Sequence, residues 1–443
     1  MPFITNTEQQ QKEMLQDLGL TMEQLFEDIP KDLRCAGLDL PSGLSEQEVQ
    51  QQLEHLAGLN ADDLICFMGG GVYDHFIPAA INAITSRGEF YTAYTPYQPE
   101  LSQGTLQAIY EYQSAICRLT EMEVANASVY DGGTALYEAI MMARRATRRE
   151  KIILDDGVNP IYRQIVRTHV RSLPVELVEV AHADGQINRK EIWAQIDDKT
   201  AAVVVQNPNF FGFIDDFTDI AETVHAQKAL LIVSVHPLSL GILKTPGAMG
   251  ADIVTGEGQS LGLPMSFGGP FLGFIATRMP HVRKLPGRIA GQTLDHQGRR
   301  GFVLTLQARE QHIRREKATS NICTNEALCA LTALIYLSLA GKQGLKEIAQ
   351  LCANKACYAY QRLTQIPQVK PHFDYQWFFN EFVIDLPLSA KEASEKLIEK
   401  GIAAGFPLSR YYKDMDKSLL IAVTEKRTKQ QIDRLAQALE AIL

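Results

Sequence analysis

Four short runs of β-branched and aliphatic residues, separated by helical stretches, constrain the fold of this chain most strongly. The runs are KIILD (151–155), VELVEV (175–180), AAVVVQNP (201–208) and ALLIVSV (229–235). Helical periodicity precedes and separates them, at about 133–148, 160–170, 190–196 and 216–227. This alternation predicts βαβ units and a mostly parallel α/β sheet with helices on both faces. Ligands of such sheets bind outside the carboxyl ends of the strands, so we expect the chemistry in those loops.

Length and pattern together predict more than one domain. At 443 residues the chain is too long for a single small core. Residues 1–60 resemble short amphipathic helices too small for a core of their own, and we expect them to dock on the main domain. Residues 61–325 carry the α/β pattern of a large domain. Residues 326–443 combine long helical stretches with strands at 382–387 and 419–423, which predicts a small C-terminal α+β domain.

The composition argues against some classes of binding partner and indicates the cellular compartment. A net charge of −9 argues against a nucleic-acid partner. The basic clusters 144–149 and 309–317 are interleaved with acids or lie on helices, so we interpret them as solvated or salt-bridged faces rather than an anion site. No apolar run approaches the roughly 18 to 20 residues that span a bilayer, which predicts no membrane partner. The N-terminus has no signal-peptide core, and seven scattered cysteines fit a reducing, cytoplasmic environment.

Three polar segments are candidate binding elements, and each also has a purely structural interpretation. Asp131–Thr134 is either a phosphate cup or, as we prefer, a helix cap. The loop from Tyr94 to Glu100 is stiffened by two prolines, and it either presents polar groups to a small zwitterion or packs its tyrosines. Residues 319–324 are either a helix N-cap cluster or a wall of an interface. The histidines and cysteines show no metal-ligand spacing, and no metal is assigned.

Two long strings give a specific resemblance. YTAYTPYQPELSQGTLQAIYEYQSAICRLTEMEVANASVYDGGTALYEA (91–139) and REKATSNICTNEAL (315–328) are similar to the P-protein of the glycine cleavage system. More narrowly, the chain resembles the N-terminal, or first, subunit of the split bacterial form. The resemblance covers essentially the whole length. It implies a fold-type I pyridoxal-phosphate-dependent transferase-like architecture and the activity of glycine dehydrogenase (aminomethyl-transferring, decarboxylating), EC 1.4.4.2.

The same resemblance implies that this chain lacks its own cofactor anchor. Family members carry the Schiff-base lysine in a His-Lys pair before a glycine run, but here Gln259 and Ser260 occupy those places. No lysine lies between Lys244 and Lys284, and 229–243 lacks the acid that meets the pyridine nitrogen in the family. The expected cofactor is therefore pyridoxal phosphate bound mainly by the partner subunit, with none covalently attached to this chain.

The implied partner is the lysine-bearing subunit 2, in a heterotetramer that decarboxylates glycine and passes the aminomethyl group to the lipoyl arm of the H-protein. The T- and L-proteins belong to the wider system. The expected lining residues of the shared site are Tyr94, Tyr97, Gln98 and Glu100, and the expected interface contacts are Ser102, Gln103 and Asn321. Two alternatives stay open. One is a self-sufficient pyridoxal-phosphate enzyme with an atypical lysine such as Lys244, and the other is a non-catalytic scaffold for the second subunit.

Overall fold

The computed structural model describes residues 5–35, 37–322 and 324–443, which divide into two compact units, 1–62 and 63–443. The first unit contains α1 (Glu8–Leu18), η1 (Gln24–Phe26), η2 (Lys31–Leu33) and α2 (Glu46–Ala57). Thr7 caps α1 and Ser45 caps α2, each in a capping box. For α2, the spacing of Ser45 and Glu48 in the sequence indicates this capping box. No residue of α1 or α2 is buried, and the docking of this segment on the main domain stays a prediction.

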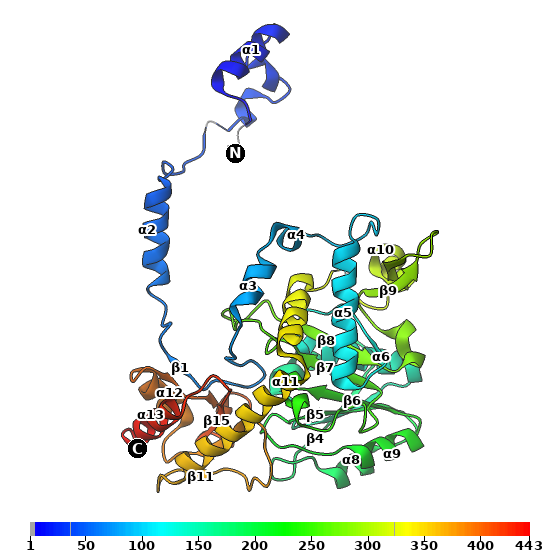
Figure 1. Ribbon diagram of the computed structural model, residues 1–443, viewed down its shortest axis with the longest axis vertical. Helices are drawn as coiled ribbons and strands as arrows, with labels where there is room; N and C mark the ends of the chain where they lie inside the picture. Colours follow the sequence, from blue (N-terminus) through cyan, green and yellow to red (C-terminus); the bar gives the residue numbers. More distant parts are fainter. Residues whose placement is uncertain (1–4, 36, 323) are drawn as a thin grey trace. The chain divides into compact units, whose positions relative to one another are not determined.

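The second unit is built on a seven-stranded sheet of order β2-β8-β7-β6-β5-β3-β4 (Figure 1). Its strands are β2 (Val124–Ala125), β3 (Lys151–Asp155), β4 (Glu176–Val180), β5 (Thr200–Asn207), β6 (Leu230–Val235), β7 (Ile253–Glu257) and β8 (Gly273–Thr277). The five strands from β3 to β7 run parallel. At one edge β8 pairs antiparallel with β7, and β2 pairs antiparallel with β8. The prediction of a mostly parallel sheet is thus confirmed.

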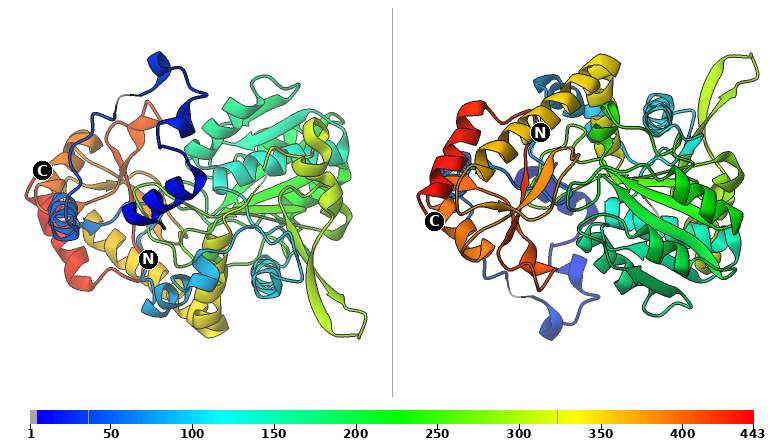
Figure 2. Two further views of the ribbon diagram at one scale, coloured as in Figure 1. Left: turned by 90° about the horizontal axis from the view of Figure 1, so that it is seen from above. Right: turned by 90° about the horizontal axis from the view of Figure 1, so that it is seen from below.

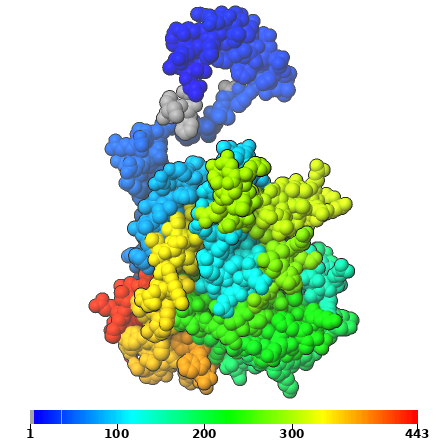
Figure 3. All heavy atoms as spheres, turned by 45° about the vertical axis from the view of Figure 1, so that its right-hand side comes forward, coloured from blue at the N-terminus to red at the C-terminus, as the bar shows by residue number. Residues whose placement is uncertain are grey.

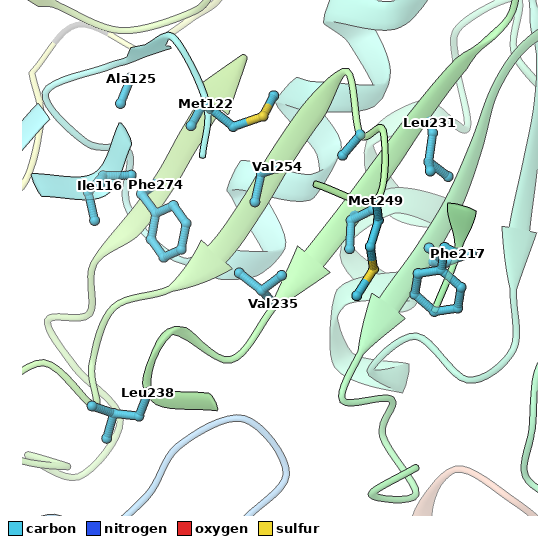
Figure 4. Close-up of a cluster of buried hydrophobic side chains, with 14 of the residues drawn as sticks. Ile116, Met122, Ala125, Phe217, Leu231, Val235, Leu238, Met249, Val254 and Phe274 are labelled. Carbon is cyan, nitrogen blue, oxygen red and sulfur yellow. The ribbon is translucent and has the colours of Figure 1, made fainter. Parts of the chain in front are cut away.

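Successive side chains of each strand point to opposite faces of the sheet, so they pack into two buried cores, one on each face. Ile153 belongs to the cluster that includes Val254 and Phe274 (Figure 4), whereas its neighbour Ile152 belongs to the opposite cluster. The covering helices are α5 (Gln103–Thr120), α6 (Gly132–Thr147), α7 (Pro160–Val170), α8 (Arg189–Gln195) and α9 (Thr218–Ala226). Burial on both faces explains why the strands are continuous apolar runs.

Two details of this unit differ from the sequence-based expectation. The sequence between the helical stretches 101–119 and 133–148 predicts a strand at 127–130, but the strand in this region is β2, which ends at Ala125. Ser128 has a φ of 143°, and beyond it only Val129 forms an isolated bridge, to Gly273. A hairpin of β9 (Ile289–Leu294) and β10 (Arg300–Thr305) was not anticipated, and it projects from the unit in both views of Figure 2. Short helices complete this region, namely α3 (Ala79–Thr85), α4 (Gly88–Tyr91), η3 (Pro237–Gly241), η4 (Met279–Lys284), η5 (Gln307–Arg309), α10 (Gln311–Arg314) and η6 (Arg315–Lys317).

The C-terminal part follows a long helix, α11 (Ala327–Thr364), that breaks at Gly341, where φ is 58° and ψ is −174°. The break agrees with the sequence, whose helical pattern predicts two stretches, 326–340 and 346–363. By length and composition α11 is also apolar enough to cross a membrane, but this is weak evidence, because it packs against α3, α5, η3 and α13.

After α11, a four-stranded sheet has the order β11-β12-β15-β14. Its strands are β11 (Lys370–Pro371), β12 (Glu381–Asp385), β14 (Phe406–Pro407) and β15 (Ser418–Ala422). The other elements are α12 (Ala390–Ile398), η7 (Leu408–Arg410), α13 (Lys429–Glu440) and the parallel pair β1 (Ile65–Cys66) and β13 (Ile402–Ala403). Residues of β1, β12, β13, β15, α12 and α13 share one buried cluster with the end of α11, which fits an α+β domain at 326–443. That domain boundary stays a prediction.

Candidate functional site

The last residue of β7, Glu257, fills the space in front of α6. Its carboxylate is buried and accepts hydrogen bonds from the backbone N–H groups of Gly132, Gln259 and Leu272, each at 2.9 Å. Asp131 caps the same helix by accepting from the N–H of Thr134 at 2.8 Å. The N–H groups that a phosphate would need are therefore occupied by carboxylates, which supports the interpretation of 131–134 as a helix cap.

Burial raises the pKa of Glu257 to about 7, although its three backbone hydrogen bonds oppose that shift. A hollow of about 420 Å³ opens beside it and is also lined by Asp131 and Glu326. Burial, and next the nearby charge of Asp131, raises the pKa of Glu326 as well. Three acidic side chains around one hollow disfavour a bound phosphate.

Gln259 and Ser260, at the place expected for the lysine pair, are both buried. Gln259 accepts from the N–H of Tyr73 at 2.9 Å and donates to the carbonyls of Tyr73 and Leu263, at 3.0 and 2.8 Å. The Ser260 hydroxyl finds no hydrogen-bond partner in the described ranges. Gln259 thus holds the segment around Tyr73 against the end of the sheet, which is a structural role.

The segment fastened by Gln259 covers the residue that follows β6. The ring of Tyr73 meets that of His236 edge-on, with centroids 4.5 Å apart. The Tyr73 hydroxyl donates to Glu381 at 2.8 Å, and the other oxygen of Glu381 accepts from the N–H of Gly70 at 2.7 Å. Neither ring nitrogen of His236 has a partner among the described residues, and burial lowers the pKa of His236. The carboxyl end of β6 is therefore closed by the chain's own side chains.

A second buried group nearby was not suggested by the sequence. His75, Cys352 and Glu425 lie far apart in the chain, but their potential ligand atoms all lie within 4.8 Å of one another. His75 Nδ1 is 2.6 Å from Glu425, and Cys352 donates to the same oxygen at 3.4 Å. Burial would raise the pKa of Glu425, but hydrogen bonds, led by the one from His75, lower it to about 2. The cluster is thus explained as an internal hydrogen-bond network.

The loop from Tyr94 to Glu100 presents most of its polar side chains outward. Tyr94 is 79% exposed and Tyr97 is 45% exposed, while Gln98 and Glu100 are also exposed. Pro96 is buried and anchors the loop. The loop thus brings Tyr94, Tyr97, Gln98 and Glu100 to the surface of this subunit, and their place in a site shared with a partner stays a prediction.

The hydroxyl of Tyr97 is held by a side chain that sequence reasoning missed. Arg288, 1% exposed, donates to the Tyr97 hydroxyl at 2.6 Å, and its guanidinium lies 5.0 Å from the centre of the Tyr97 ring. Glu310 lies 3.8 Å from Arg288. Arg288 follows a Gly in an irregular stretch, and no motif marks it. Tyr97 is therefore oriented by a buried cation, whereas Tyr94 is free at the surface.

The three expected interface contacts have different environments. Gln103 is exposed, but its amide donates to the carbonyl of Phe302 at 2.8 Å and accepts from its N–H at 2.9 Å, so it joins α5 to the hairpin. Figure 3 shows α5 (cyan) at the surface beside the yellow-green hairpin region. Ser102 is half-buried, and its side chain does not cap α5. Asn321 is exposed, and Cys323 lies outside the described residues.

Comparisons with known proteins agree with this architecture. A family model described as "Glycine cleavage system P-protein" matches residues 1–439. The chain belongs to the glycine cleavage P-protein family. It is 56% identical over 444 residues to the "Probable glycine dehydrogenase (decarboxylating) subunit 1" of Geotalea uraniireducens strain Rf4 and 53% identical to that of Nitratidesulfovibrio vulgaris strain Hildenborough, with 100% of each chain covered. Within the P-protein family it is thus of the subunit 1 type.

Solved structures give the same assignment. A crystal structure of glycine decarboxylase (P-protein) in inhibitor-bound form is similar with a TM-score of 0.93 and 43% identity over 100% of both chains. A sphingosine-1-phosphate lyase of Burkholderia pseudomallei and a glutamate decarboxylase of Lactobacillus brevis have TM-scores of 0.67 and 0.65 at 13% identity, which shows the fold alone. This P-protein subunit therefore has the fold of type I pyridoxal-phosphate enzymes, as predicted.

The residues of this P-protein subunit do not fit pyridoxal phosphate at the end of its own sheet. Ser260 offers no amine, and the carboxylate of Glu257 takes the N–H groups in front of α6. Lys244, the atypical lysine considered above, donates instead to Asp216 at 2.7 Å and to Thr218 at 2.9 Å near the surface. Its ammonium is occupied by an ion pair, which argues against a self-sufficient enzyme.

The buried Glu381 gives a pH-dependent stability that a neutral amide will remove. Burial raises its pKa to about 7, so the folded state holds its proton more tightly than the unfolded state does. Its contribution is fully present below the ordinary pKa of a glutamate and is lost as the pH rises through about 7. The lost contribution is on the order of 3 kcal/mol.

We therefore expect Glu381→Gln to flatten the decline in unfolding free energy between about pH 5 and pH 8. Urea unfolding at several pH values measures this decline. Because Glu257 titrates in the same range, the quantity that matters is the difference between parent and variant. Glu222→Gln, at an exposed position, is the matched control. Parallel curves for the parent and Glu381→Gln would contradict the assignment.

Proposed function

We propose that this P-protein subunit is the non-lysine half of a heteromeric glycine dehydrogenase (decarboxylating), EC 1.4.4.2, in the cytoplasm. Its relatives carry that enzyme's name as subunit 1, which implies a subunit 2. The observation that carries the proposal is a contrast within one chain. At the end of its own sheet Glu257 and Gln259 use the backbone groups around them for internal hydrogen bonds, while Tyr94 and Tyr97 face outward.

In this proposal subunit 2 supplies the lysine and pyridoxal phosphate, and glycine is decarboxylated in a site that both subunits line. This chain contributes Tyr94, Tyr97, Gln98 and Glu100 from the stiff loop, and Ser102, Gln103 and Asn321 lie at or near the interface. The phenols donate hydrogen bonds to a substrate carboxylate, and the packed loop excludes water from the reacting atoms. The aminomethyl product passes to the lipoyl arm of the H-protein.

Co-expression with subunit 2 tests this function. We expect a stable complex, an α2β2 heterotetramer, that exchanges label between bicarbonate and the glycine carboxyl group, and no exchange by this chain alone. A half-enzyme buries a large interface, commonly above about 2,000 Å², so light scattering of an equimolar mixture should show the complex. Only free monomers, or full exchange by subunit 2 without this chain, would overturn the proposal. A complex in which loop variants keep full turnover would favour the scaffold alternative.

Covalent labelling gives a separate prediction about the cofactor. After incubation with pyridoxal phosphate and reduction with borohydride, we expect no pyridoxyl-lysine in peptides of this chain, because Ser260 replaces the lysine and Lys244 is paired with Asp216. In the complex the label should appear on subunit 2. Peptide mapping by mass spectrometry measures both. A specific pyridoxyl group on any lysine of this chain would contradict the prediction.

A further inference from the structure

One arginine of the first basic cluster, Arg145, lies beside residues of the second cluster around one cavity, which the sequence did not predict. The cavity has a volume of about 370 Å³. Its polar lining consists of Arg145, Arg283, Arg309, Arg314, Lys317 and Thr319. Arg145 comes from the last turn of α6, and the others come from the segment that runs from η4 past η6. Arg145 is therefore 138 or more positions away in the chain from the other side chains that line the cavity.

The described lining of this cavity carries five cationic side chains and no acidic one. None of its five cationic side chains has a carboxylate oxygen within 4.0 Å of its nitrogens among the described residues. The acids whose charges act on Arg145 and Arg309 are Glu138 and Glu310, and one oxygen of each, Glu138 Oε2 and Glu310 Oε1, is buried without a hydrogen-bond partner in the described part of the chain. Arg314 and Lys317 are exposed and Arg144 pairs with Glu150, which fits the interpretation of a solvated or salt-bridged face, whereas Arg145 and Arg309 are neither fully exposed nor salt-bridged among the described residues.

Two guanidinium groups lie at the base of the cavity with donors unused. The Nε and Nη2 atoms of Arg145 and the Nε atom of Arg309 are buried and lack a hydrogen-bond partner in the described part of the chain. Arg309 otherwise donates to the carbonyls of Leu285 and Gly287, which fixes its side chain. Burial lowers the pKa of both arginines, and the charges of Glu138 and Glu310 oppose that shift. Burying a cation without a counter-ion is energetically unfavourable, and a bound anion would offset this penalty.

Cations at the end of a helix also stabilise its dipole, and Arg144 and Arg145 lie in the last turn of α6. That effect does not require buried donors without partners. Nor does it explain why Arg283, Arg309 and Arg314 converge on the same space from short helices, whose dipoles are small. The planar fork of a guanidinium matches the oxygens of a phosphate group, and several such forks around one cavity are typical of phosphate recognition.

We propose that this cavity binds a small molecule bearing a phosphate or pyrophosphate group, with Arg145 and Arg309 at its base and Arg283, Arg314 and Lys317 at its rim. Base and rim follow the side-chain exposures, because Arg283, Arg314 and Lys317 are exposed. The site is separate from the cofactor end of the sheet. Arg145 lies 13 residues along α6 from Gly132, a distance of about 20 Å at the helical rise.

Isothermal titration of the full chain with inorganic phosphate and with pyrophosphate, at constant ionic strength, tests the proposal. We expect one saturable site per chain, with pyrophosphate the tighter ligand. Arg145→Gln and Arg309→Gln should each weaken it at least about tenfold, because each removes a charge-assisted donor. The rim variant Arg314→Gln, at an exposed position that should not affect folding, should weaken it about two- to fivefold. The control Arg148→Gln, exposed and outside the cavity, should bind within about twofold of the parent.

Three results would overturn the proposal. The first is the absence of saturable binding by the folded parent. The second is equal weakening by Arg148→Gln, which would indicate non-specific binding to a basic surface. The third is phosphate binding by the free chain that disappears in the complex with subunit 2, because an acidic side chain of the partner would then be the occupant. Binding that persists in the complex and depends on Arg145 and Arg314 supports a small-molecule site.

Discussion

Replacing Tyr94 by phenylalanine is expected to lower glycine turnover by the complex with subunit 2 about 10²- to 10³-fold, because a preorganised donor in a closed site stabilises a transition state by on the order of 2 to 4 kcal/mol. The Tyr94 ring is 79% exposed in this subunit, so loss of the hydroxyl leaves its packing unchanged. Glycine–bicarbonate exchange measures the effect. Light scattering checks that the complex still forms.

Two companion variants sharpen this experiment. Tyr411→Phe, in the C-terminal part of the chain, is the matched control and should leave turnover within about twofold of the parent. Tyr97→Phe should lower turnover as well, but it also removes the acceptor of the buried Arg288, so we expect it to lower stability. If Tyr94→Phe assembles normally and turns over glycine within about twofold of the parent, the loop is structural and the shared-site proposal fails.

Replacing Glu257 by leucine is expected to lower the free energy of unfolding by more than about 4 kcal/mol. The change leaves the N–H groups of Gly132, Gln259 and Leu272 buried without an acceptor, and each such group costs about 1 to 3 kcal/mol. Urea unfolding at neutral pH measures the loss. The measurement tests whether the Glu257 carboxylate, rather than a bound ligand, accepts the hydrogen bonds of these N–H groups at the end of the sheet.

The amide variant Glu257→Gln should lower the free energy of unfolding for the same reason, but by less. Glu257→Gln keeps one oxygen, which can accept from two of the three N–H groups, so an intermediate loss is expected. Glu222→Leu, at an exposed position without an ion pair among the described residues, should change stability by less than about 0.5 kcal/mol. A loss below about 1 kcal/mol for Glu257→Leu would show that solvent or a bound anion satisfies these donors instead.

Local patterns were sufficient to predict much of the fold. Continuous apolar runs separated by helical segments predicted the parallel part of the sheet, because strands buried on both faces carry little polar alternation. The interruption of helical periodicity near Gly341 predicted the two halves of α11. The hairpin of β9 and β10 was missed although the Asp295–Gly298 turn between two strand-like runs is a hairpin signal, since its short, partly polar runs are weak as strands.

Some features of the candidate site were likewise predictable from the sequence, and others were not. The absence of a lysine between Lys244 and Lys284 and the polar loop from Tyr94 to Glu100 are properties of adjacent residues, so the sequence alone determined them, as it determined the family. Only the tertiary structure decided that Glu257 fills the space before α6, that Arg288 holds Tyr97, and that Arg145 joins Arg309 at one cavity. Each of these contacts joins residues more than 100 positions apart, and such contacts follow from how strands and helices pack rather than from any local pattern.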